Sequence, residues 1–325
     1  MHPWGGRQVV CEGSSVSFVH VRPMLDLDLE RADHVMRLAF GTFRGLPDPS
    51  VAFGDREMVR TRFEAAPEWA WVAEVDGEVA GSVFAARWGS FGFFGPLTVH
   101  PALWDRGIGS RLLVPVLEAF ERWDVRQAGL YTFATSPKHL GLYQKHGFRP
   151  GHLIVILDRA VDPRMRAPYS VVSGDDGRAL AEIRVLTDEV FSGLDLGHEI
   201  VAVAGQGIGQ TLLVRRKGTL EGMAVCHCGA GSEGGSGTCY VKFAAALPRA
   251  GARDRFSRLL DACEAFAAEN GLGRLEVGVD TGRLNAYGDL LDRGYRIEQI
   301  GVSMLLRHEH PYFDTPSHHV ITDLR

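Results

Sequence analysis

Hydrophobic and polar positions along the first 160 residues follow two periods. Residues 69–75 and 79–86 alternate as strands do, and the Asp76-Gly77 pair between them is a strong hairpin signal. Residues 25–40 instead repeat their apolar side chains at helical spacing. In chain order the pattern predicts a strand at 16–21, helices at 25–40 and 56–63, strands at 69–75, 79–86 and 93–99, a helix at 107–122, a strand at 129–133, a helix at 137–145 and a strand at 153–157. A strand meander followed by a crossover helix gives a mixed, mostly antiparallel sheet flanked by helices, an α/β (α+β) fold.

The same order of elements returns in the second half. Residues 158–168 are charged, contain proline and have few apolar side chains, so we interpret them as a linker. After them the pattern predicts a helix at 179–191, a hairpin at 212–216 and 220–228, a flexible glycine-rich loop at 229–237, a strand at 240–247, a helix at 253–268, a strand at 274–279, a helix at 285–292 and a strand at 297–306. The chain is therefore expected to form two domains, 1–160 and 161–325.

Three short matches indicate that the two halves are copies of one unit. Pro101 and Pro248 each follow a strand and stand 147 positions apart (248 − 101). The same offset maps the tetrapeptide SRLL at 110–113 onto an identical SRLL at 257–260, and Gly-Phe at 147–148 onto Gly-Tyr at 294–295. An unrelated second domain is the alternative.

Composition limits the classes of function. The chain has 325 residues, 45% of them hydrophobic and 23% charged, as in globular proteins. It has no stretch of about 18 apolar residues that would predict a membrane helix, and no secretory pattern at its start. A formal charge of −5 argues against nucleic acid as the main partner.

The cysteines indicate a reducing compartment. Five of them in a chain this long do not make a disulfide framework, so we expect a cytoplasmic protein. Cys226, Cys228 and Cys239, with His227, admit a metal cluster. Their spacing fits no zinc pattern well, and burial in a strand explains them better, so we expect no metal site.

The candidate chemistry lies in the two-glycine turn that opens the helix at 107–122. The first N–H groups of a helix lack intrahelical partners and carry partial positive charge, so they attract anions. Gly107 and Gly109 would let the backbone approach a phosphate closely, and Arg106 adds positive charge. The turn predicts a phosphate site, and a plain glycine turn before a helix is the alternative.

Two motifs together resemble the GNAT N-acetyltransferase family. The family's Gln/Arg-x-x-Gly-x-Gly/Ala motif is matched by residues 104–109, WDRGIG, and its Leu-Tyr-x-Lys-x-Gly-Phe motif by residues 142–148, LYQKHGF. The resemblance covers residues 16–157 and, more weakly, the second half. It implies two tandem GNAT-like domains and transfer of an acetyl group from acetyl-CoA to an amine.

The resemblance also implies a place for each part of the cofactor. Backbone N–H groups of the loop would hold the pyrophosphate, and main-chain groups of the preceding strand would hold the pantetheine arm and polarise the thioester carbonyl. Tyr143 would protonate the departing thiolate, although packing of its ring on the sheet is the alternative. The implied coenzyme A contacts are Leu97, Thr98, Val99, Trp104, Asp105, Arg106, Gly107, Ile108, Gly109, Ser110, Ser136 and Tyr143.

Three positions depart from the family pattern. Trp104 stands where Gln or Arg is usual, so a polar contact to the cofactor is expected to be missing. Ser136 stands where Asn is frequent, and Pro115 lies inside the helix and is expected to kink it. No general base is visible, and we assign that role to none of three side chains considered for it: Asp48, Glu74 and His100.

The second half lacks the groups that carry the chemistry. The offset maps Gly107, Gly109 and Tyr143 onto Asp254, Phe256 and Leu290. An acidic group would repel phosphates and a phenyl ring would block their approach. We therefore expect the second half to support the first domain or shape the acceptor site, without binding coenzyme A in this way.

Two further features are expected to carry no chemistry. The run GQGIG at 205–209 precedes a strand, whereas a nucleotide-binding glycine loop opens a helix. The tail holds four histidines, for which an exposed terminus is the default and metal capture the alternative: His308, His310, His318 and His319.

The sequence thus predicts a cytoplasmic N-acetyltransferase for a small-molecule amine or peptide acceptor, with no nucleic-acid or membrane partner. A non-catalytic acetyl-CoA-binding or interaction module is the alternative of another class. A longer acyl donor than acetyl is a third possibility.

Overall fold

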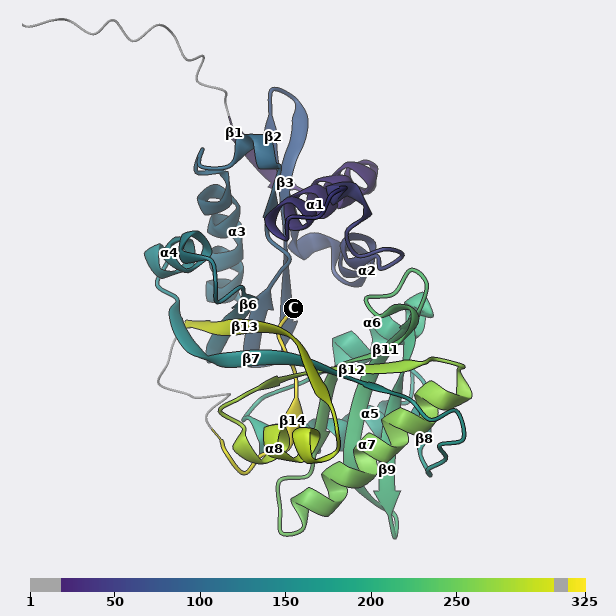
Figure 1. Ribbon diagram of the computed structural model, residues 1–325. Helices are drawn as coiled ribbons and strands as arrows, with labels where there is room; N and C mark the ends of the chain where they lie inside the picture. The colour runs from purple at the N-terminus through teal and green to yellow at the C-terminus, as the bar shows by residue number, and fades with distance from the viewer. Residues whose placement is uncertain (1–18, 307–314) are drawn as a thin grey trace, which may run out of the picture.

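The computed structural model describes residues 19–306 and 315–325. Within them one sheet runs in the order β1-β2-β3-β4-β6-β13-β7-β12-β11-β10-β9-β8, through both halves of the chain. Figure 1 shows the first half, purple to teal, above the second half, which is mostly green. The predicted class, a mostly antiparallel sheet flanked by helices, is confirmed. None of the helices described is long and apolar enough to cross a membrane.

The first half is a meander completed by a crossover. Its strands are β1 (Val19–Pro23), β2 (Ala70–Val75), β3 (Glu78–Trp88), β4 (Phe91–Phe94), β5 (Thr98–Val99), β6 (Gln127–Thr132) and β7 (Arg149–Ala160). Its helices are α1 (Leu29–Phe43), α2 (Met58–Ala65), α3 (Ile108–Arg122) and α4 (Pro137–Lys145). Because β4 and β6 are parallel, a crossover must join them, and α3 provides it. This helix buries Leu112, Leu113 and Phe120 in the core and continues past Pro115.

The single strand predicted at 93–99 is divided in two. The parallel pairing of β4 with β6 ends at Phe93, and the chain then leaves the ladder at 95–97. It resumes as β5, which pairs with β3 through Ser82 and Gly81. A Cβ atom at Gly81 would lie 2.5 Å from the carbonyl oxygen of Thr98, so this close approach requires glycine. The chain after Phe93, which includes β5, therefore diverges from β6.

The second half repeats this plan with additions. Its strands are β8 (Ser170–Val172), β9 (Gly209–Arg216), β10 (Thr219–Gly229), β11 (Gly235–Ala246), β12 (Arg274–Asp280), β13 (Arg296–Leu306) and β14 (Val320–Ile321). Its helices are α5 (Gly177–Val190), α6 (Gly197–Gln206), α7 (Ala252–Glu269) and α8 (Leu284–Asp292). The sequence did not predict α6 or β8. The glycine run at 205–209 ends α6 and enters β9, as expected of a turn.

Each half contributes one strand that pairs with the other half. β13 comes from the second half but pairs with β6, and β7 comes from the first half but pairs with β12. The two strands also pair with each other, and Figure 1 shows them crossing the middle of the molecule. The halves are thus joined by backbone hydrogen bonds. The division into 1–160 and 161–325 stays a prediction.

Three segments differ from their expectations. The linker predicted at 158–168 begins inside β7, where Asp158 and Arg159 pair with β12. The loop predicted to be flexible at 229–237 buries Ser232 and Glu233, and its end belongs to β11. Of the four tail histidines, His319 is buried rather than exposed, His318 is half-buried, and His308 and His310 lie outside the described residues; the residues after them, Val320 to Leu324, are buried as well.

The buried tail fills a gap in the second half. β14 pairs with Ala244 and Ala245 of β11, beyond the point where the parallel pairing of β11 with β12 ends at Val241. Ile321 is fully buried in a core cluster with residues of α7 and β12. The residues of β14 therefore fill the space where β11 and β12 separate.

Candidate functional site

A cavity of about 530 Å³ occupies the divergence of β5 and β6 in the first half. Its wall includes eleven of the twelve residues implied to contact coenzyme A: Leu97, Thr98, Val99, Trp104, Asp105, Gly107, Ile108, Gly109, Ser110, Ser136 and Tyr143. Arg106, the twelfth, is exposed and is not part of this wall. The structure thus brings both sequence motifs to one cavity.

The start of α3 has the geometry expected of an anion site. Gly107 caps the helix in the left-handed region at φ 75°, where glycine is favoured, and nothing lies within 4 Å of the position of its missing Cβ. A Cβ at Gly109 would lie 3.3 Å from Leu142 and 3.6 Å from Leu97. The N–H groups of a first helical turn lack helical partners, and Gly107 to Ser110 of this turn line the cavity.

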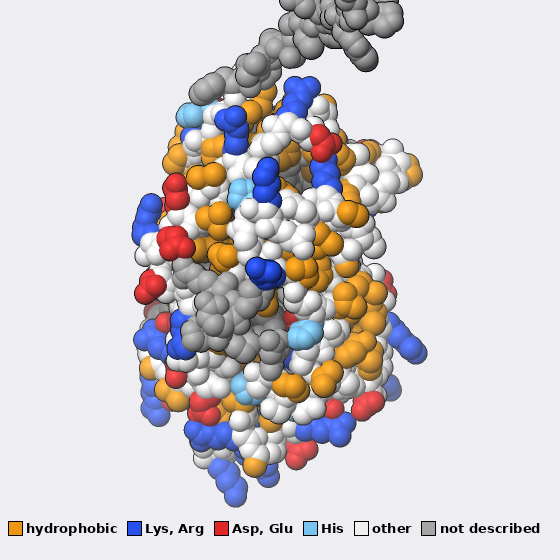
Figure 2. Space-filling view, turned by 90° about the vertical axis from the view of Figure 1, so that its left-hand side faces the viewer, with side chains coloured by type: hydrophobic (Ala, Val, Ile, Leu, Met, Phe, Trp, Pro, Cys, Tyr) orange, Lys and Arg blue, Asp and Glu red, His pale blue; other side chains and the backbone are white. Residues whose placement is uncertain are grey.

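A basic side chain from α4 reaches the same loop. Lys138 Nζ lies 2.8 Å from a carboxylate oxygen of Asp105 and 5.2 Å from the centre of the Trp104 ring. Both Lys138 and Lys145 line the cavity. Figure 2 looks onto the side on which α4 lies in Figure 1, and hydrophobic side chains gather there around the middle of the molecule with a few lysines and arginines among them.

Two of the departures from the family pattern have local roles. The indole Nε1 of Trp104 donates a hydrogen bond of 2.7 Å to the carbonyl oxygen of Val99. It therefore occupies one main-chain acceptor on the strand implied to hold the pantetheine. The hydroxyl of Ser136 caps α4 by accepting a hydrogen bond of 3.3 Å from the backbone N–H of His139.

Tyr143 is buried where the cavity meets the core of the first half. Its ring packs edge-on against Phe94 and Phe148, with centroid distances of 5.8 and 6.4 Å. Burial raises the pKa of its phenol well above the ordinary value. The group therefore keeps its proton at neutral and mildly alkaline pH, which is the state required of an acid.

The three side chains considered for the general base lie elsewhere. Asp48 caps a short helical turn by accepting a hydrogen bond from Ser50 N–H, and Glu74 pairs with Arg22. His100 accepts a hydrogen bond from Ala102 N–H. None of the three is part of the cavity wall described.

The second half supplies one side of the cavity. The contributing residues come from the loop before β11, from β11, from β13 and from the end of the chain: Glu233, Tyr240, Gln299, Leu324 and Arg325. Figure 1 marks this end of the chain at the centre of the molecule, between the halves. No sequence pattern indicates these positions, because the strand exchange that brings them there depends on long-range pairing.

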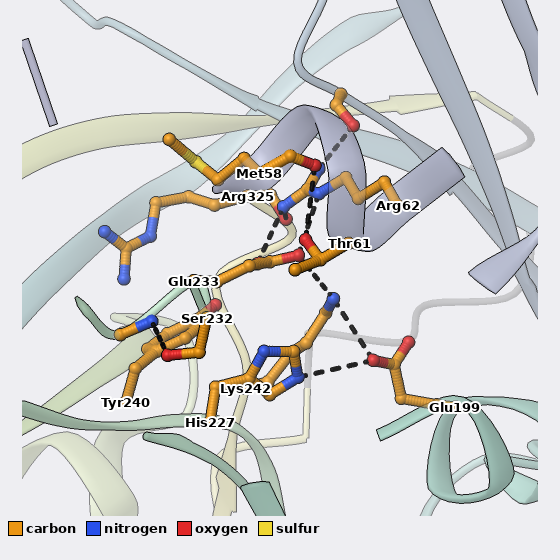
Figure 3. A network of polar contacts seen from close by, with 12 residues as sticks. Met58, Thr61, Arg62, Glu199, His227, Ser232, Glu233, Tyr240, Lys242 and Arg325 are labelled. Atoms are coloured by element: carbon orange, nitrogen blue, oxygen red, sulfur yellow. Dashed lines mark hydrogen bonds and ion pairs between the residues drawn. The ribbon is translucent and has the colours of Figure 1, made fainter. Parts of the chain in front are cut away.

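A buried network of charges joins the halves behind this wall (Figure 3). Arg62 of α2 meets Glu233 through two hydrogen bonds of 2.9 and 3.0 Å. Lys242 lies 2.9 Å from Glu233 and 3.1 Å from Glu199, whose other oxygen accepts a 3.2 Å hydrogen bond from the indole of Trp88. Arg62 also donates to the carbonyl oxygen of Gly95, just before the segment that leads into β5.

The network holds its carboxylates ionised. Burial acts to raise the pKa of Glu233, but Arg62 and Lys242 outweigh it and hold that pKa well below the ordinary value. Burial opposes ionisation of Glu199 as well, and there Lys242 and His227 bring the pKa to about 2. Carboxylates with so low a pKa are weak bases. The hydrogen bonds between Glu233 and Arg62 join the loop of Glu233 to α2.

The parts of the chain that the structure describes contain no group of three or more His, Cys, Asp or Glu side chains arranged to hold a metal ion. Cys226 and Cys239 are fully buried in the apolar core of the second half, in keeping with their interpretation as strand residues.

Comparison with known proteins finds a family model that matches part of the chain. A family model for an acetyltransferase (GNAT) domain matches residues 67–150, a range that includes the loop 104–109 and Tyr143. No curated protein matches the sequence.

Solved structures share the fold over most of the chain. A protein from Pyrococcus horikoshii named a "putative acetyltransferase" is 17% identical with a TM-score of 0.68, over 96% of this chain and 97% of that one. A GCN5-related N-acetyltransferase from Sphaerobacter thermophilus is 16% identical with a TM-score of 0.56, over 88% and 95%. A tandem GNAT protein from the clavulanic acid biosynthesis pathway is 15% identical with a TM-score of 0.54, over 89% and 98%. At these identities the likeness establishes the fold.

Proposed function

We propose that the chain moves an acetyl group from acetyl-CoA to a primary amine, from the premise that residues 67–150 match the model of an acetyltransferase (GNAT) domain. The acceptor is a small molecule or a peptide, and the location is cytoplasmic. The observation that carries the proposal is the main-chain edge at Leu97–Val99. It faces an open cavity in the first half, whereas the corresponding edge of the second half is already covered by β14.

The cavity offers partners for the pyrophosphate and for the pantetheine arm of coenzyme A. The pyrophosphate would meet the free N–H groups at the start of α3, with Lys138 and Lys145 beside them. The pantetheine arm would lie along Leu97–Val99 as an added strand does. The Val99 carbonyl is already bonded to Trp104, so the arm would rely on the remaining main-chain groups of this segment.

Transfer needs one proton donor and one proton acceptor. The amine nitrogen attacks the thioester carbonyl carbon, the carbon–sulfur bond then breaks, and the departing thiolate takes the proton of the Tyr143 hydroxyl. A backbone N–H of the 97–99 segment would stabilise the negative charge on the carbonyl oxygen. The proton released by the amine must go to a base.

His139 is the proposed base. The acidic or imidazole side chains in the described wall are Asp105, Glu233 and His139. Asp105 is held by Lys138 at the phosphate end, and Glu233 is ionised by its cationic partners. Burial, followed by Lys138, lowers the pKa of His139 below its ordinary value, so its imidazole is neutral at pH 7 and able to accept a proton.

A pH profile tests the base. Activity of the wild type, as kcat/KM, should fall toward acid as His139 becomes protonated, with a midpoint below pH 6.5. His139→Gln should remove this acid limb and lower the rate at pH 7.5. His34→Gln, on the exposed face of α1, is the control and should change neither the acid limb nor the rate. An unaltered acid limb in His139→Gln would exclude the assignment.

A non-catalytic acetyl-CoA-binding module remains the second candidate, because Trp104 occupies the Val99 carbonyl. Free-thiol release from acetyl-CoA across a panel of primary amines separates the two. Amine-dependent release supports the transferase. Binding of coenzyme A by calorimetry without release on any amine would support the module, and an absence of binding would exclude both.

A further inference from the structure

Six ring side chains line part of the cavity and contact one another. They come from α1, from the turn before α2, from the end of β6 and from α4: Phe40, Phe43, Phe53, Tyr131, Phe133 and His139. We call this set the ring wall. Phe43 lies on Phe133 at a centroid distance of 4.7 Å and on His139 at 5.1 Å. Phe40 joins Phe53 at 5.1 Å and Phe133 at 6.0 Å.

The ring wall is only half-buried. All six side chains keep part of their surface accessible, whereas aromatic residues in the core of the same half, such as Phe94 and Phe148, are fully enclosed. Apolar surface left open to water in a cavity favours a ligand that covers it. Flat ring faces are covered most completely by another planar ring, stacked or edge-on.

The ring wall shares its cavity with Tyr143 and the 97–99 segment. A molecule seated on the rings would therefore present its amine toward the reacting carbonyl. His139 belongs to both the ring wall and the proposed chemistry, so ring contact and proton removal would occur at one place.

Polar groups also line the cavity that contains the ring wall. Gln299 of β13 donates a hydrogen bond of 2.6 Å to the hydroxyl of Tyr131, which leaves the hydroxyl proton of Tyr131 for a ligand. Arg56 and Arg325 reach the wall, and both pair with Glu276 behind it. An alkyl chain would offer no acceptor to the hydroxyl proton of Tyr131, whereas a ring bearing a polar substituent matches rings and polar atoms together.

We propose that the acceptor is an aromatic amine: a primary amine on a short arm from a planar ring, with the ring seated on the ring wall. This inference rests on the proposed acetyl transfer and specifies its substrate class. A longer acyl chain in the same space is the competing occupant.

The experiment compares matched amines on the full chain with acetyl-CoA. Tyramine and phenylethylamine are the aromatic probes, and hexylamine is the aliphatic probe of similar apolar size. We expect kcat/KM to be at least about tenfold higher for the aromatic probes. Phe133→Leu keeps an apolar side chain but removes a ring, and should cut kcat/KM for tyramine about threefold to tenfold. The same substitution should change kcat/KM for hexylamine by less than about twofold.

One control variant and three outcomes separate failures of the different claims. Phe191→Leu removes a half-buried ring outside the described cavity wall and should leave kcat/KM unchanged for all three amines. Equal use of hexylamine and tyramine, or no effect of Phe133→Leu, would overturn the aromatic acceptor while acetyl transfer stands. Tighter binding of decanoyl-CoA than acetyl-CoA that is lost in Phe133→Leu would assign the space to an acyl chain and overturn it too. Coenzyme A binding without turnover on any amine would overturn the proposed function and this inference together.

Discussion

The two halves of the molecule carry the same divergence of strands, and they use it differently. The repeat offset of 147 maps Leu97, Thr98 and Val99 onto Ala244, Ala245 and Ala246. In the second half this edge is taken: Ala244 and Ala245 pair with β14, and the N–H of Ala246 donates a 3.0 Å hydrogen bond to the carbonyl of His319. The chain thus places its own backbone where the first half is proposed to place pantetheine.

The starts of the two crossover helices refine this difference. α7 begins with a left-handed glycine, Gly251 at φ 84°, as α3 does with Gly107 at φ 75°. The offset maps Gly107 onto Asp254, however, so α7, with its cap at Gly251, starts about one turn before the matching position. Its buried Phe256, which the offset matches to Gly109, packs on His319 at a ring distance of 5.1 Å. The copies therefore differ in whether the cleft is filled, rather than in whether a glycine cap was kept.

Tyr143→Phe gives the largest expected change. Removing the proton donor should lower kcat by about 10²–10⁴-fold with little effect on coenzyme A affinity, because the ring that packs on Phe94 is kept. Tyr287→Phe in α8 of the second half is the matched control and should leave the rate unchanged. A rate in Tyr143→Phe equal to that of the wild type would remove the acid from the account.

The glycine caps offer a matched pair of substitutions. Gly107→Asp should weaken coenzyme A binding more than about 100-fold, since a carboxylate would face the pyrophosphate. Space is available for the new side chain at both Gly107 and Gly251, apart from the flexible end of Arg255 near the latter. Gly251→Asp meets the same backbone strain, so its coenzyme A affinity should equal that of the wild type. Calorimetry on the two variants checks the contrast, which fails if both lose affinity or neither does.

Ile321→Val gives the smallest expected change. Loss of one methyl group from a fully buried site should reduce the free energy of unfolding by about 0.5–1.5 kcal/mol. Coenzyme A should stabilise this variant and the wild type by the same increment in a thermal melt, because the ligand occupies the other cleft. A smaller increment in Ile321→Val would indicate that β14 and the ligand share a site.

Much of this arrangement was predictable from local patterns. The Asp76-Gly77 hairpin formed between β2 and β3, and α4 spans the predicted range, because in both places the residues next to each other in sequence decide the structure. The two motifs lie in one cavity because the start of a crossover helix and the following helix both border the same strand ends.

Other parts depended on distant contacts. Nothing in the alternation of β7 or β13 indicates that each would pair with the other half, since pairing partners are not encoded in a period of two. For the same reason Gln299 and Glu233 gave no sign of reaching the cavity. Exposure is the default for a terminus, yet Val320 and Ile321, which follow the tail histidines, are apolar and pair with an open strand edge.

The most direct test of the account is the number of coenzyme A molecules bound per chain, measured by titration calorimetry on the intact protein. If the first cleft is open and the second is filled by β14, the titration will show one site per chain, and Gly107→Asp will abolish it. Two sites per chain, or one site that survives Gly107→Asp, would contradict the assignment of binding to the first half.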